Sequence, residues 1–224
     1  MSTVTRTRLA AAFGLLSVVG TFAGLAIHGY PDIGASGRQI AHWATTTNQH
    51  QFAIGIYVEA VAILLFLGFA AWLWSVARDA EGGSGWLSTA GFSAAALYVV
   101  LALTSNAVWW SVLDSGHRGT NPQTLASIRD IAQHAFDASN LCFAMFLILG
   151  GYALFSTRAL PRLVGATAMV LGLGLMVPQT AQLAMIPVFV WIVAVSIYLL
   201  VRPNPATTVT EPAGVMSARP LGMS

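Results

Sequence analysis

The chain has 224 residues, of which 56% are hydrophobic and only 8% are charged. Soluble domains carry about 25% charged residues, so this composition excludes an ordinary soluble domain and indicates a membrane protein. The net charge of +2 and the scattered arginines exclude a nucleic-acid-binding surface, and the single cysteine, Cys142, excludes an intrachain disulfide.

Six apolar stretches are candidate bilayer spans, each of which requires roughly 20 residues, and the fifth of them is rather short and rich in glycine. In chain order they cover residues 9–27, 52–77, 86–113, 133–155, 163–177 and 183–201. The first resembles the apolar core of a signal peptide, but it is as long as a full span and no clear A-x-A cleavage site follows it, so we expect it to be retained. The sequence therefore predicts an all-α, polytopic transmembrane helical bundle of six spans over residues 1–201. Residues 202–224 are rich in proline and lack apolar periodicity, which predicts a disordered cytoplasmic tail.

The connections between these stretches carry further local signals. Residues 30–51 are polar and include a candidate short surface helix near residues 39–44. Asn121-Pro122 is a typical helix start, with asparagine at the cap and proline in the first turn. We expect the amphipathic stretch that follows to continue directly into the fourth span.

The arginines favour one orientation of the six spans. If both termini are cytoplasmic, the inner side holds most of the arginines, namely Arg6, Arg8, Arg78, Arg158, Arg162, Arg202 and Arg219. The outer side then holds only Arg38, Arg118 and Arg129. This asymmetry follows the positive-inside rule, so we predict a multi-pass protein of the cell (inner) membrane with both termini inside.

Polar side chains inside apolar spans are costly and are the best candidates for function. Glu59, Asn106, Asp137 and Asn140 lie on three predicted helices. Glu59 and Asn106 are about 10 Å from the outer helix end, Asn140 is about 10–12 Å from it, and Asp137 is somewhat shallower. We interpret these four residues as the ligand-binding lining of an outward-facing polar recess. The alternative is structural: a protonated Glu59 bonded to Asn106 or Asn140 would only hold helices together.

Two histidines raise a second possibility. Asp130, His134, Asp137 and Asn140 recur at a spacing that lines one helix stripe. A faint internal repeat, Gln-His-x-Phe, opens both the second and the fourth span and places His50 and His134 in equivalent outer positions. Such a pair can ligate haem iron axially, although histidines at helix entrances more often cap helices or bond to loops. Haem is thus the one cofactor considered, and no metal site or catalytic residue is assigned, because motifs such as HExxH and GxSxG are missing.

The turn Leu160-Pro161-Arg162-Leu163-Val164-Gly165 and the glycine-rich segment after it resemble an uncharacterised family of bacterial, often actinobacterial, integral membrane proteins, defined as a domain of unknown function. The resemblance extends loosely over residues 9–200 and includes His28 near the end of the first span. It implies a six-helix fold and no residue roles.

The sequence favours a protein that binds or passes a small molecule or lipid at the polar recess. Two other classes remain open: a membrane electron-transfer protein with haem held by His50 and His134, and a non-catalytic membrane subunit. The expected partners are membrane lipid, a small molecule, and a second copy of the chain or a membrane complex.

Overall fold

The computed structural model describes residues 2–32, 34–177 and 181–203, and within these it is helical without strands. The helices follow the chain as α1 (Thr3–His28), α2 (Gly37–Thr46), α3 (Gln49–Glu81), α4 (Trp86–His117), α5 (Pro122–Thr157), α6 (Arg162–Leu175) and α7 (Ala181–Val201). Nearly all of the predicted tail, residues 204–224, lies outside the described residues.

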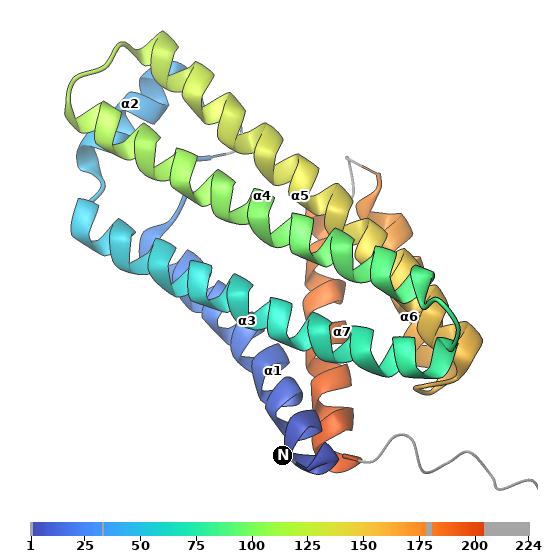
Figure 1. Cartoon of the computed structure of the whole chain (residues 1–224). Coiled ribbons are helices and arrows are strands. Elements are labelled where there is room, and N and C mark those ends of the chain that lie inside the picture. Colours follow the sequence, from blue (N-terminus) through green and yellow to red (C-terminus); the bar gives the residue numbers. More distant parts are fainter. Residues whose placement is uncertain (1, 33, 178–180, 204–224) are drawn as a thin grey trace, which may run out of the picture.

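Six of these helices form a closed ring. α1 packs on α3, α3 on α4, α4 on α5, α5 on α6, α6 on α7, and α7 returns to α1. α2 is short and lies against α4 and α5 at one end of the bundle (Figure 1). The end of α7 lies beside the N-terminus, at the opposite end (Figure 1). The ring places polar groups from different helices toward a common interior.

Five of the helices are long and apolar enough to cross a membrane: α1, α3, α4, α5 and, within α7, Leu183–Val201. This indicates a multi-pass membrane protein. The fifth predicted span, residues 163–177, corresponds to α6, which has 14 residues and a length of about 21 Å. That is shorter than the roughly 30 Å hydrocarbon core of a bilayer.

The local helix signals in the sequence are confirmed. Asn121 caps α5 by accepting a hydrogen bond from the backbone N–H of Gln123, with Pro122 in the first turn. α5 then runs without a break for 36 residues. The short surface helix is α2, which begins with a reciprocal capping box between Ser36 and Gln39.

Small residues set the helix spacing where the chain carries the Leu-Pro-Arg turn. Arg158 ends α5 in the left-handed conformation, with φ of 58°, and Pro161 precedes α6. α6 then returns so closely that a Cβ atom on Gly165 would lie 2.5 Å from the carbonyl oxygen of Gly151. In membranes such small residues permit close backbone approach and helix association. The turn is therefore a tight hairpin between α5 and α6.

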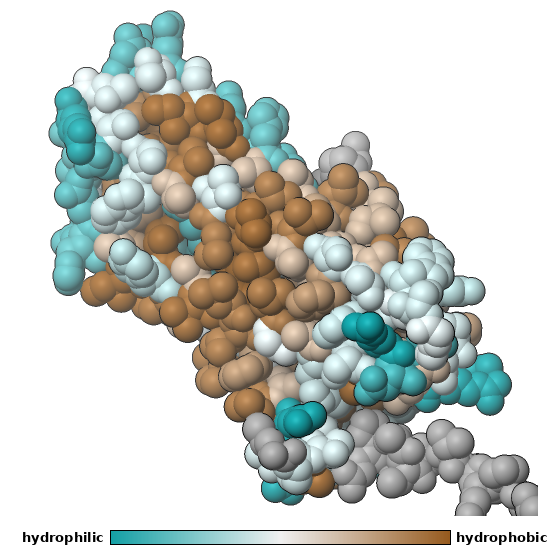
Figure 2. All heavy atoms as spheres, in the orientation of Figure 1, coloured by the Kyte–Doolittle hydropathy of each residue, from teal (hydrophilic) through white to brown (hydrophobic). Residues whose placement is uncertain are grey.

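The buried side chains divide into two separate hydrophobic clusters. The larger is built from the helices of the ring and includes Phe66, Phe143 and Trp191. The smaller, which we call the outer cluster, consists of Ala35, Ile40, Ala44, Phe52, Trp109, Val112, Leu113, Leu125 and Ala132. Figure 2 shows hydrophobic residues over the middle of one face, with hydrophilic residues toward both ends.

Candidate functional site

A polar group of four side chains lies between the two hydrophobic clusters, and we call it the Glu59 group. His28 ends α1, Tyr30 follows in the next loop, Glu59 is on α3 and Asn106 is on α4. His28 Nε2 lies 3.1 Å from Glu59 Oε2, and the Tyr30 hydroxyl lies 3.3 Å from the same oxygen. The Tyr30 hydroxyl also lies 3.3 Å from Asn106 Oδ1. One loop residue thus connects polar side chains from α3 and α4.

Glycines bring α1 close enough to α3 for this contact. A Cβ atom on Gly55 would lie 2.5 Å from His28 Cδ2, and one on Gly24 would lie 2.9 Å from Glu59 Cβ. Because Gly24 and Gly55 have no side chains, the His28 ring packs directly on the backbone of α3. Gly29, with φ of 59°, then ends α1 and turns the chain toward Tyr30.

The Tyr30 hydroxyl is a shared donor. It has one proton and faces two acceptors at equal distance, so it can donate to only one of them at a time. Burial, followed by the charge of Glu59 and the hydrogen bond to it, raises the pKa of Tyr30 well above its usual value. Tyr30 therefore remains a neutral donor to Glu59 at any physiological pH.

Buried polar atoms in and below this group are left without partners. His28 Nδ1 and Asn106 Nδ2 are buried and accept or donate no hydrogen bond. Asn140 Oδ1 on α5 is also buried without a hydrogen-bond partner, and Asn140 is only 5% exposed. An unsatisfied buried polar atom costs about 1–3 kcal/mol. The bonds within the protein therefore leave hydrogen-bonding capacity unused at three positions.

Asn140 lies deeper than the Glu59 group. Ser105, the neighbour of Asn106, donates a hydrogen bond to the carbonyl oxygen of Ala132 on α5. Asn140 is two helical turns, about 12 Å, further along α5 from that point. Beyond it, Tyr98 and Phe143 stack with ring centroids 4.6 Å apart. Asn140 thus occupies the interior between the Glu59 group and an aromatic layer.

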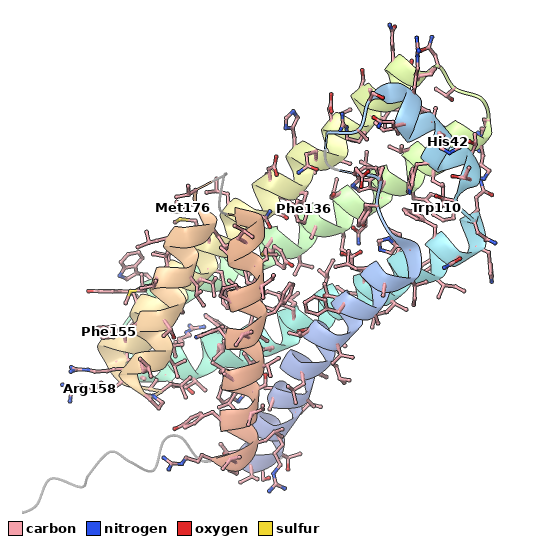
Figure 3. All side chains as sticks on the ribbon, turned by 180° about the vertical axis from the view of Figure 1, so that it is seen from behind. His42, Trp110, Phe136, Phe155, Arg158 and Met176 are labelled. Carbon is pink, nitrogen blue, oxygen red and sulfur yellow. The ribbon has the colours of Figure 1, made fainter. Side chains whose placement is uncertain are left out.

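Aromatic rings of the outer cluster cover the Glu59 group. Tyr30 lies 5.1 Å from Trp109 and 6.2 Å from Phe52 between ring centroids, and His28 lies 5.1 Å from Phe52. Trp43 of α2 contacts both Phe52 and Trp109, at 5.6 and 5.9 Å. Figure 3 shows His42 of α2 and Trp110 at this end of the molecule, with Phe155 and Arg158 at the opposite end. The Glu59 side chain keeps 13% of its surface exposed beneath this cover.

The structure joins only some of the residues singled out from the sequence. Glu59 and Asn106 are linked through Tyr30, and Asn140 is buried more deeply. Asp137 is exposed and accepts a hydrogen bond from Gln133 on its own helix. It therefore lies outside the Glu59 group.

The two histidines considered for haem are both exposed, His50 at the start of α3 and His134 in α5. Asp130 is exposed as well and pairs with Arg129. The predicted stripe on α5 is therefore divided, with only Asn140 facing the interior. Among the described residues, no three His, Cys, Asp or Glu side chains gather closely enough to hold a metal ion.

Sequence reasoning missed His28 and Tyr30 as members of the site. A signal for His28 exists: Gly20, Gly24 and His28 recur every four residues and therefore share the face of α1 that packs on α3. On α3, Gly55 and Glu59 have the same spacing. Tyr30 has no such periodic signal, because it reaches the site from a loop.

A small apolar pocket lies elsewhere, near the other end of the ring. Its lining includes Trp74, Gly91, Gly150, Gly151 and Trp191, and it does not include Glu59. The pocket and the Glu59 group are therefore separate features.

Residues 9–202 match a protein family described as a domain of unknown function, DUF4386. The chain belongs to this family, as the resemblance at the Leu-Pro-Arg turn implies. No curated protein and no solved structure matches the chain.

Proposed function

We propose that this member of an uncharacterised family binds a small molecule or lipid at the Glu59 group, which faces the outer side of the cell (inner) membrane. The observation that carries the proposal is a carboxylate held by His28 and Tyr30 between two hydrophobic clusters, with unused hydrogen-bonding atoms around it. Intramembrane ionisable residues of this kind mark binding sites or pathways.

The depth of the Glu59 group supports an outward-facing site. Along α3, Glu59 is about 28 Å from Arg78, close to the thickness of the hydrocarbon core. Apart from Ile131, the exposed side chains of α5 are polar as far as Asp137, and Leu141 is exposed and apolar. With Arg78 at the inner boundary, the Glu59 group lies at the outer boundary. α2 and the ends of α3, α4 and α5 then extend beyond the membrane.

Placing Arg78 at the inner boundary and the Glu59 group at the outer boundary also supports six crossings with both termini inside. Gly14 of α1 packs against Ser196 of α7, so the start of α1 and the end of α7 lie on one side. α5 also ends on that side, as does α3. α6 must therefore carry the chain away from it before α7 returns, and we propose α6 as a short sixth crossing.

The main alternative is that the Glu59 group only holds α1, α3 and α4 together. A hydrogen-bond network that serves only stability should provide a partner for every buried polar atom, because each atom without a partner costs free energy. His28 Nδ1, Asn106 Nδ2 and Asn140 Oδ1 are not satisfied. This favours a site that receives its remaining partners from a bound molecule or from water.

The test compares the molecules that purify with three forms of the protein. Wild type, Glu59→Gln and Asp137→Asn are extracted in mild detergent, and their bound lipids and metabolites are identified by native mass spectrometry. We expect a molecule bound to wild type and to Asp137→Asn that is lost in Glu59→Gln. Asp137→Asn is the matched control, since it removes an exposed carboxylate outside the Glu59 group. The same bound molecules in all three forms, or none in any, would favour the structural alternative.

A further inference from the structure

The carboxyl group of Glu59 has few basic side chains near it. The only basic side chain paired with Glu59 within the described part of the chain is His28, and imidazole is charged only when protonated. The arginine ion pairs in that part are elsewhere, Arg118 with Asp114 and Arg129 with Asp130. The chain has no lysine. A ligand entering here therefore meets an acceptor that lacks a permanent cationic partner.

Aromatic rings are the second feature of the same place. Tyr30 contacts the Glu59 carboxylate, and Phe52 and Trp109 pack against Tyr30. Trp43 of α2 packs against both Phe52 and Trp109. The negative face of an aromatic ring attracts ammonium groups, most strongly when the site excludes water. Asn106 Oδ1 adds a neutral acceptor beside the carboxylate. A carboxylate, an amide oxygen and several ring faces together suit an organic ammonium group.

We infer that the ligand of the Glu59 group carries an ammonium group, protonated or quaternary, which binds against the Glu59 carboxylate beneath the aromatic rings. The inference rests on the proposed function and specifies its ligand class. An anionic or phosphate-bearing centre is disfavoured next to Glu59 by like-charge repulsion. The ammonium group has two possible sources at this depth, the headgroup of a membrane lipid and a free amine from the outer side.

The experiment uses the full-length protein in nanodiscs of phosphatidylglycerol, which has no ammonium group. Choline is titrated in, and binding is followed by tryptophan fluorescence, since Trp43 and Trp109 belong to the aromatic cover. The matched ligand is 3,3-dimethyl-1-butanol, which has the shape of choline without its charge. We expect saturable binding of choline, at least about tenfold weaker binding of the neutral alcohol, and a similar loss in Glu59→Gln. Asp137→Asn should bind choline as wild type does.

A second set of nanodiscs identifies the source of the ammonium group. If phosphatidylethanolamine in the bilayer competes with choline and weakens its apparent affinity, the lipid headgroup is the occupant. If the affinity is the same in both bilayers, the occupant is a free amine. Either result supports the inference.

Equal binding of choline and the neutral alcohol would overturn the inference. This comparison needs only the unaltered protein, so it decides the matter even where Glu59→Gln does not fold. If a Glu59-dependent molecule without an ammonium group copurifies and choline does not bind, the ligand class is wrong and the proposed function stands. If neither binds, both proposals fail.

Discussion

Replacing Gly55 by alanine should separate His28 from Glu59 without removing either side chain. The new Cβ would lie 2.5 Å from His28 Cδ2 and 2.7 Å from His28 Cβ. Carbon atoms in contact are about 3.5–4.0 Å apart, so α1 must move away from α3 by about 1 Å, or the ring must leave its position. Overpacking of this kind typically costs 1–3 kcal/mol.

The assay for Gly55→Ala is thermal unfolding in mild detergent, followed by the native mass spectrometry described above. We expect a lower unfolding temperature together with loss of the molecule whose binding depends on Glu59. Gly150→Ala is the matched control, since a Cβ there meets nothing closer than 3.7 Å and alanine favours a helix by up to about 1 kcal/mol. If Gly55→Ala is as stable as wild type and binds equally well, then the close approach of α1 and α3 does not position the site.

Three further predictions concern single features. Tyr30→Phe keeps the ring but removes the donor to Glu59, so unfolding measurements should show a loss of about 1–3 kcal/mol, and an unchanged stability would contradict the role of the hydroxyl. Asn121→Ala removes the cap of α5 and should cost about 1 kcal/mol in the same assay while leaving ligand binding at the Glu59 group unaltered. His50 and His134 are both exposed, so the purified protein should show no Soret band; a band that disappears in His50→Ala or His134→Ala would instead establish haem ligation.

The sequence predicted the helices well because their signals are local. Apolar length marked the long helices, and the Asn121-Pro122 pair marked the start of α5. The length of α6 was less predictable. Its apolar run continues to Val177, but the helix ends at Leu175, and Pro178 lies among residues outside the described part. Composition alone does not distinguish a short helix from a full crossing.

The site was only half predictable, for a geometric reason. Helical spacing shows which residues share a face, but it does not show which face turns inward. Asp130, His134, Asp137 and Asn140 satisfied the spacing, yet only Asn140 is buried. The exposed side of α5 drifts around the helix axis over several turns, since 3.6 residues per turn do not divide evenly into the spacing used. Tyr30 reaches Glu59 from a loop, so no periodicity could have identified it.

The proposed position of the Glu59 group, at the outer boundary of the membrane, would explain how the protein keeps unsatisfied polar atoms at a tolerable cost. A carboxylate at the centre of a bilayer costs several kcal/mol, and near the interface water and headgroups reduce that cost. Phe52 and Trp109 pack against Tyr30, and Tyr30 supplies Glu59 with one neutral donor. Because this donor is shared with Asn106, neither acceptor is fully satisfied. An ammonium group bound against the Glu59 carboxylate would leave the Tyr30 hydroxyl to donate to Asn106, so each of the two acceptors would then have a partner of its own.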